Sequence, residues 1–342
     1  MKSKSQIIRE MPKIELHLHL EGAFTLEYLL KLIHKYEPAS PVMKVQELRK
    51  RFEFNDFEHF LKAWNWKNRY FRTREDFQRS VFMTIEALVK QNVIALEAFF
   101  SPWDFLEAGI SSEDVIRATI AGVEDAEKCF GIPINLIADI IRNHGHETAI
   151  NRLDELMPYK EKICGIGLGG DETHFPAAPF KDVFCEARKR GFRVTAHAGE
   201  SAGPDSVRDA VCLLGAERIG HGITSIHDPS LIKMLKEKQI PLEICPTSNL
   251  KTRVVDKIEN HPVRSFFNKG LLVTINTDDP TMFGISITEE FEFLNKSYGF
   301  TLREIKQLTK NALHASFFNE GQKFLLNRKI EAFWEKILTK EN

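Results

Sequence analysis

The sequence predicts an α/β protein with the fold of a (β/α)8 barrel, and three observations carry this prediction. Short apolar and β-branched runs alternate with helical segments, which is typical of parallel strands joined by helices. Eight such runs are present, the number that closes this kind of barrel. Polar residues follow six of the runs, at the face where barrel enzymes place their sites. The predicted strands are 14–20, 93–100, 134–141, 165–168, 193–197, 218–220, 241–245 and 271–276.

Capping residues and apolar spacing place helices between these strands. Thr25 can cap the helical sequence LEYLLKLIHKY, and Ser112 precedes another long helical segment. Residues 179–189 carry apolar side chains at helical spacing. Near the end of the chain, Thr301 and Glu304 have the spacing of a capping box. These helices supply the crossovers that parallel strands require.

The interval between the first two strands is unusually long. It contains about 70 residues, whereas a simple crossover requires roughly a dozen. We therefore expect one domain over residues 1–342, with a helical insertion at about residues 22–90. Four apolar residues in this insertion recur at helical spacing and could form either plain core or an apolar lid over the barrel mouth. They are Phe57, Phe60, Leu61 and Trp64.

Composition favours a globular protein that binds a small molecule. The chain has 342 residues, 43% of them hydrophobic, and a formal net charge of −1. This charge argues against nucleic acid or an anionic membrane as a partner, since both usually require a basic excess. The five cysteines form no CxxC motif, and we find neither a signal peptide nor a membrane-spanning run. We expect a cytoplasmic protein, and the sequence leaves its oligomeric state open.

Two histidines in the first predicted strand indicate a metal centre. Side chains alternate faces along a strand, so His17 and His19 point to the same side and can bind one ion. His197 and Asp278 each end a later apolar run. Three imidazoles and one carboxylate suit zinc or a similar divalent ion.

Six motifs between residues 15 and 280 resemble, in their order, those of the adenosine deaminase family of metal-dependent 6-aminopurine deaminases. They are ELHLHLEG, GGDE, HAGE, GHG, CPTSN and NTDDP. The resemblance implies one zinc ion per chain, held by His17, His19, His197 and Asp278 with a water. The chemistry agrees, because zinc lowers the pKa of bound water from about 15.7 to about 7, and attack at C6 of a purine requires a proton donor at N1.

The resemblance also implies individual roles in catalysis. Glu200 would give its proton to N1, and His221 would act beside the zinc water as a base or an electrostatic guide. Asp279 would bind purine N7, and the amide of Gly170 would contact N3. Ser248 is a candidate to support the site by a hydrogen bond to the catalytic histidine.

The expected substrate is adenosine or 2′-deoxyadenosine, which would give inosine or 2′-deoxyinosine and ammonia. Glu21 stands where many adenosine-specific members have aspartate, and Phe99 stands where they often have arginine, so adenine or a 5′-modified adenine nucleoside is the alternative. Glu21 disfavours a nucleotide, because it would repel a 5′ phosphate. The residues expected to contact the substrate beside the metal or on its sugar side are His19, Glu21, Phe60 and Trp64.

Other classes and other histidines receive less weight. A binuclear amidohydrolase would need a lysine at the end of strand four, where the sequence reads GIGLGGDE. A non-catalytic purine-binding or signalling protein on the same barrel is the alternative of a different class, although every ligand and acid position is filled. His144 and His146 are assigned no metal, but His144 is a candidate to line the pocket. Six histidines, His261 among them, receive no role.

Overall fold

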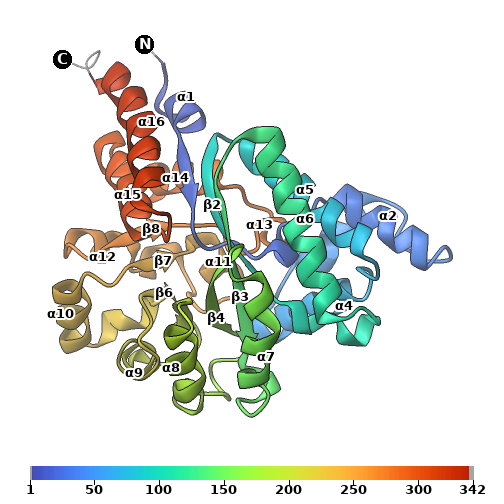
Figure 1. Cartoon of the computed structure of the whole chain (residues 1–342). Coiled ribbons are helices and arrows are strands. Elements are labelled where there is room, and N and C mark those ends of the chain that lie inside the picture. The colour runs from blue at the N-terminus through green and yellow to red at the C-terminus, as the bar shows by residue number, and fades with distance from the viewer. Residues whose placement is uncertain (1, 339–342) are drawn as a thin grey trace.

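A computed structural model describes residues 2–338. Its eight parallel strands form one sheet in chain order, and helices surround it (Figure 1). An isolated parallel bridge between Leu18 and Asp278 joins the segments that follow the first and last strands and closes the ring. The predicted (β/α)8 barrel is confirmed. The strands are β1 (Lys13–Glu15), β2 (Val93–Phe100), β3 (Ile134–Ile141), β4 (Ile163–Gly169), β5 (Arg193–Ala198), β6 (Arg218–His221), β7 (Leu242–Ile244) and β8 (Val273–Ile275).

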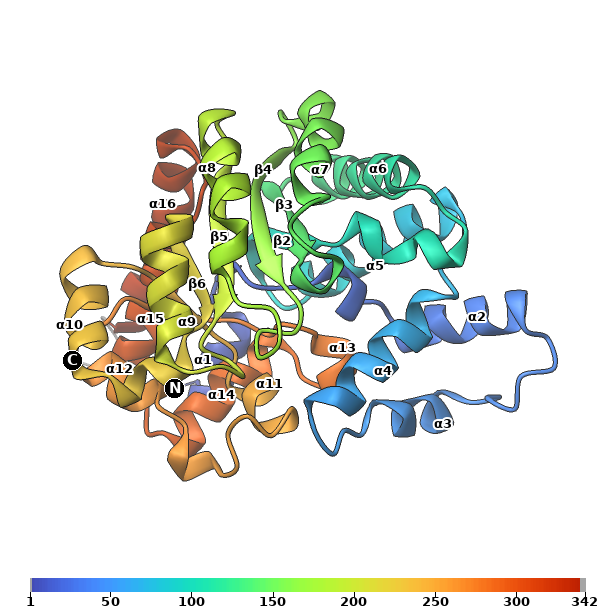
Figure 2. The same ribbon diagram turned by 90° about the horizontal axis from the view of Figure 1, so that it is seen from below.

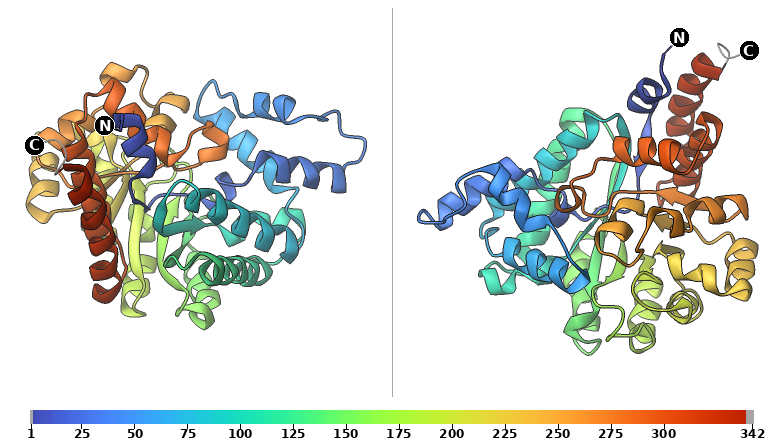
Figure 3. Two further views of the ribbon diagram at one scale, coloured as in Figure 1. Left: turned by 90° about the horizontal axis from the view of Figure 1, so that it is seen from above. Right: turned by 180° about the vertical axis from the view of Figure 1, so that it is seen from behind.

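Helices cover the outside of the barrel and build the long insertion after β1. Helices α1 and α16 lie on the same side of the molecule (Figures 1 and 3). Within residues 2–338, we find no helix with the length and apolar character needed to span a membrane. The helices are α1 (Lys4–Glu10), α2 (Leu26–Tyr36), α3 (Val45–Arg49), α4 (Phe57–Asn68), α5 (Arg74–Val89), α6 (Ser112–Phe130), α7 (Ala149–Leu156), α8 (Lys181–Lys189), α9 (Pro204–Asp209), α10 (Pro229–Lys238), α11 (Pro246–Lys251), α12 (Val263–Asn268), α13 (Pro280–Phe283), α14 (Ile287–Ser297), α15 (Leu302–Ala315) and α16 (Glu320–Leu338).

The first strand is shorter than predicted. β1 ends at Glu15, so His17 and His19 lie beyond it and not within it. The backbone there pairs with the segment after β8, where Asp278 N donates to His17 O and His19 N donates to Asp278 O, both at 2.9 Å. The same segment still contacts β2, where Phe99 N donates to Leu18 O at 2.8 Å, and the pairing with Asp278 holds both histidines next to that residue. β2 and β3 match their predicted ranges, whereas β7 and β8 are shorter than predicted.

The helix caps follow the sequence closely. The Thr25 side chain accepts from Tyr28 N at the start of α2, and the predicted capping box of Thr301 and Glu304 begins α15. The cap of α6 is Ser111, one residue before the predicted Ser112, because its hydroxyl accepts the backbone N–H of Asp114. These three helix starts were therefore predicted to within one residue, whereas α8 begins at Lys181, two residues after the start of the predicted range 179–189.

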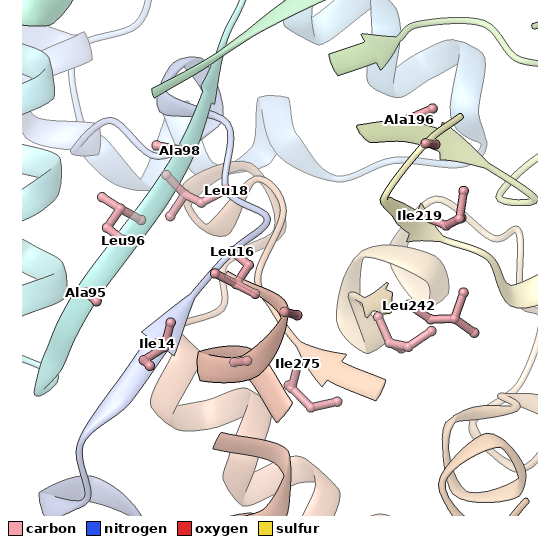
Figure 4. Packing of buried hydrophobic residues seen from close by; sticks show 14 of the residues in the cluster. Ile14, Leu16, Leu18, Ala95, Leu96, Ala98, Ala196, Ile219, Leu242 and Ile275 are labelled. Carbon is pink, nitrogen blue, oxygen red and sulfur yellow. The ribbon is translucent and has the colours of Figure 1, made fainter. Parts of the chain in front are cut away.

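In the described part of the chain, two apolar clusters account for the core. The first fills and surrounds the barrel, where Ile14, Leu18, Leu96 and Ile275 are almost fully buried (Figure 4). Burial of such side chains contributes about 1.5–3 kcal/mol each, so this cluster is the main source of stability.

The second cluster lies mainly in the insertion, which projects from the barrel as α2, α3 and α4 (Figure 2), and it includes side chains from residues 105–118 and from α13. Phe60 of α4 stacks on Phe283 of α13 with ring centroids 5.3 Å apart. This contact fixes α4 against the segment that follows β8. Phe60 and Trp64 belong to this cluster and also line the central cavity of the barrel. The two alternatives for the apolar residues of the insertion, plain core and an apolar lid, are therefore compatible.

Candidate metal centre and active site

The four predicted metal ligands lie together at the carboxyl ends of the strands. His19 Nε2 and His197 Nε2 are 3.1 Å apart, and Asp278 Oδ1 is 3.4 Å from His19 Nε2 and 3.5 Å from His17 Nε2. All four side chains are buried. Among the described residues, His17 Nε2 has no hydrogen-bond partner. Ring nitrogens and a carboxylate that converge with an unpartnered lone pair fit a divalent cation, and the ligand types suit zinc.

The backbone at this centre adopts an unusual conformation. Asp278 and His221 have φ angles of 63° and 62°, in the left-handed region that non-glycine residues rarely occupy. Gly170 has a φ of 94°, which favours glycine. Strained positions of this kind concentrate at functional sites, where the surrounding structure must hold them in place.

Buried polar groups behind the centre orient two of the predicted ligands. His17 Nδ1 lies 2.9 Å from Glu243 Oε2, which leaves Nε2 free for a metal. Glu243 also pairs with Arg218, with Nε and Oε1 2.5 Å apart. Although burial raises the pKa of Glu243, Arg218 and His17 outweigh it and the net pKa is lowered. Ser248 Oγ donates to Asp278 Oδ2 at 2.6 Å.

Ser248 therefore supports Asp278, a predicted metal ligand, and not His221. The hydrogen bond to His221 comes from the next residue, Asn249, whose Nδ2 lies 3.0 Å from His221 Nδ1. The expected partner of Ser248 was wrong because the chain enters α11 at this point. Consecutive residues of a helix face different directions, so Ser248 and Asn249 reach different partners.

Glu200 lies beside His221 and Asp278 in the loop after β5. Its Oε2 is 3.7 Å from His221 Nε2. Burial, followed by the charges of Asp278 and Glu172, raises the pKa of Glu200 well above its ordinary value. A carboxyl group with a raised pKa can hold the proton that N1 of a purine would need.

Glu172, the last residue of the GGDE motif, fixes the loop that carries Glu200. Its carboxylate accepts the backbone N–H groups of residues 199–202; Oε2 accepts those of Glu200, Ser201 and Ala202 at 3.0, 3.0 and 3.1 Å. Four backbone donors on one buried carboxylate make a rigid anchor. The sequence analysis gave Glu172 no role, although its place in a motif was a usable signal.

The central cavity has a volume of about 190 Å³ and opens at the carboxyl ends of the strands. His19, His197, Glu200 and His221 lie on its metal side. The remaining predicted substrate residues on its walls are Gly170, Asp279, Phe60 and Trp64. Burial and the neighbouring Asp278 raise the pKa of Asp279 well above its ordinary value, so its carboxyl group can donate a hydrogen bond.

Glu21 lies behind the cavity and not on its wall. Its Oε1 accepts the backbone N–H of Ser101 at 2.7 Å, and Ser101 is the residue that faces the cavity. Burial raises the pKa of Glu21 to about 7, with Lys67 acting in the opposite direction. Lys67 is itself fully buried, with Nζ 3.7 Å from the centroid of the Trp64 ring.

Two acidic residues of the cavity wall were missed by the sequence analysis. Asp104 accepts the indole N–H of Trp64 at 3.3 Å and lies 3.6 Å from His144 Nε2, which also lines the cavity. Asp139 is buried at the end of β3, and within residues 2–338 its Oδ1 has no hydrogen-bond partner. A carboxylate inside the apolar run INLIADII was a signal that could have found it.

Asp139 also lies close to two of the predicted metal ligands. One of its oxygens and one ring nitrogen each of His19 and His197 lie within 4.8 Å of one another. Side chains at Gly167 and Gly169 of the neighbouring strand would collide with its carboxylate, so these glycines make room for it.

A parallel eight-stranded barrel with three imidazoles and a carboxylate at the ends of its strands is the architecture of a metal-dependent barrel enzyme. The family model for adenosine deaminase matches residues 12–333. The chain therefore belongs to the adenosine deaminase family.

Relatives within the family extend over almost the whole chain. An adenine deaminase from Acinetobacter baylyi is 34% identical over 321 residues, which cover 94% of this chain and 97% of that protein. The crystal structure of an adenine deaminase from Arthrobacter aurescens superposes with a TM-score of 0.91 at 30% identity, covering 95% of this chain and 99% of that one. An amidohydrolase from Burkholderia ambifaria with bound zinc has a TM-score of 0.89 at 26% identity, covering 99% and 96%.

Proposed function

We propose that this chain hydrolyses the exocyclic amine of adenine and releases ammonia. The relatives favour adenine, the alternative of the sequence analysis, over adenosine. The observation that carries the proposal is the position of Glu21, which lies behind Ser101 and does not line the cavity. A sugar hydroxyl in the cavity would therefore not contact the Glu21 carboxylate, which the sequence analysis predicted to lie on the sugar side of the substrate.

The residues at the centre support a division of labour. His17, His19, His197 and Asp278 would hold one zinc ion, which when bound supplies a nucleophilic water at neutral pH. Glu200 gives a proton to purine N1 as charge develops there.

Two further groups recognise the purine at nitrogens other than N1. The protonated carboxyl of Asp279 donates to N7, and the amide of Gly170 donates to N3. Phe60 and Trp64 of α4 cover the base with apolar surface and exclude water, so we infer that the insertion at residues 22–90 acts as a lid.

A substrate panel tests the proposal directly. The metal-loaded chain is assayed with adenine, adenosine, 2′-deoxyadenosine, AMP and 5′-substituted adenosines for ammonia release and loss of adenine absorbance. We expect the highest kcat/KM for adenine. A higher kcat/KM for a nucleoside would reject the choice of adenine, and the absence of ammonia from all substrates would reject a 6-aminopurine deaminase.

A further inference from the structure

A series of hydrogen bonds leads from the backbone of α12 to His221 through two buried side chains without an assigned role. Val263 N donates to His261 Nδ1 at 3.2 Å. His261 Nε2 lies 3.2 Å from Asn249 Oδ1, and Asn249 Nδ2 lies 3.0 Å from His221 Nδ1. All three side chains are at most 4% exposed.

The direction of these hydrogen bonds is fixed at the backbone end. A backbone N–H can only donate, so His261 Nδ1 must carry a lone pair. Burial lowers the pKa of His261 to about 3, and the single proton of the neutral ring is then on Nε2, where it is donated to Asn249 Oδ1. The amide nitrogen of Asn249 consequently faces His221. The opposite orientation of the amide would require a proton on His261 Nδ1, against the N–H of Val263.

The hydrogen bond from Asn249 determines which nitrogen of His221 carries the proton. His221 Nδ1 accepts from Asn249, so the proton of the neutral ring lies on Nε2. Nε2 lies 3.7 Å from Glu200 Oε2 and 3.8 Å from Asp278 Oδ2. Both neighbours offer oxygen lone pairs, which an N–H group complements.

We propose that Asn249 and His261 are positioning residues that hold His221 with its proton on Nε2. His221 then faces the reacting atoms as a hydrogen-bond donor and not as a base. This inference rests on the proposed deamination, and it decides between the two roles that the family resemblance allowed for His221.

The proton balance follows from this assignment. His221 has no lone pair toward the cavity, so it does not take a proton from the attacking water. Glu200 protonates N1 and, now a carboxylate, accepts the first proton of the water. The C6–N bond breaks once the amine has received the second proton of the water, and ammonia leaves. One proton of the water thus restores the proton that Glu200 gave to N1, and the other completes the ammonia.

Nitrogen NMR on the full chain tests the tautomer without any substrate. The metal-loaded protein is labelled with 15N at histidine, and His221 is assigned by comparison with His221→Asn. We expect a neutral His221 ring with its proton on Nε2 in the unaltered chain. In Asn249→Asp we expect the proton on Nδ1, because a carboxylate can only accept. A proton on Nδ1 in the unaltered chain overturns the proposal, whether or not the protein deaminates adenine.

Kinetics then test the consequence for turnover. At full metal content, Asn249→Asp should lower kcat at least about tenfold, the value of one hydrogen bond, with little change in KM. His261→Gln keeps an N–H group toward Asn249 and should retain turnover. His261→Glu can only accept a hydrogen bond and should lower kcat as Asn249→Asp does. If Asn249→Asp loses metal, His261→Glu takes its place in the test. Asn151→Asp on the exposed face of α7 is the matched control. Unchanged kcat with an inverted tautomer overturns the role as a donor.

Discussion

Glu200 is the side chain through which the proposed chemistry is most directly tested. Glu200→Gln keeps the shape of the side chain but removes the proton that N1 needs, so kcat should fall by at least about 10². Metal content should not change, because Glu200 is not among the predicted ligands. Steady-state kinetics with elemental analysis measure both quantities.

The matched control for this variant is Glu53→Gln, which makes the same change at an exposed position outside the cavity. It should keep the turnover of the unaltered chain. Turnover at that level in metal-loaded Glu200→Gln would show that another group protonates N1.

Glu21 offers a test of substrate choice at the same scale. Glu21→Asp shortens the side chain that holds the backbone of Ser101. Ser101 can then move on the cavity wall, and we expect the ratio of kcat/KM for adenine and adenosine to shift by about 1–3 kcal/mol.

The comparison of the two substrates on both proteins measures this shift. Deamination of 6-aminopurines should persist in the variant, since Glu200, Asp279 and Gly170 are untouched. An identical ratio in the two proteins would mean that Glu21 has no influence on the sugar side of the cavity.

At the scale of single elements, α11 and α14 are joined by a buried carboxyl group. Glu290 Oε1 accepts the backbone N–H of Thr247 at 3.0 Å, and Glu290 is fully buried. Burial raises the pKa of Glu290 from 4.5 to about 8. Between these two values the folded protein holds a proton that the unfolded chain has released.

The contact between α11 and α14 should therefore weaken as the pH rises from about 5 to 8. We expect this change to lower the free energy of unfolding by at least about 1 kcal/mol. Glu290→Gln, which cannot ionise, should remove that part of the pH dependence. Urea unfolding at pH 5.5 and pH 8 compares it with the unaltered chain and with Glu53→Gln, and equal pH dependence in all three would contradict the assignment.

At the scale of the whole molecule, the predicted metal ligands come from distant parts of the chain. They lie in the segments after β1 and β8 and at the end of β5, so an ion bound to them would cross-link the ring. An ion that binds only the folded state adds about 2.7 kcal/mol at 100 times its Kd. Chelation should therefore lower Tm by several degrees and abolish activity.

Elemental analysis should find one ion per chain before chelation, and added zinc should restore both Tm and activity. Asp278→Asn, which lacks a charged ligand, should regain neither at the same zinc concentration. Full activity in chelated protein with no bound metal would exclude a metal-dependent reaction.

Much of the fold follows from local sequence. Strands β2 and β3 and the caps at Thr25 and Thr301 depend on neighbours within a few residues, and they were predicted correctly. The short strands β1, β7 and β8 were predicted too long. Their limits depend on where partners from distant segments stop pairing, and the sequence does not specify those partners.

The sequence by itself determined the kind of chemistry, because imidazoles and carboxylates at strand ends in a parallel barrel must converge at one face. The tertiary structure decided which groups touch. In the folded chain, Glu21 lies behind Ser101, and Asp139 lies beside the predicted metal ligands His19 and His197. The side chain that hydrogen-bonds to His221 is that of Asn249 and not that of Ser248. A hydrogen bond depends on distances of a few tenths of an ångström between residues far apart in the chain, and only the packed structure sets those distances.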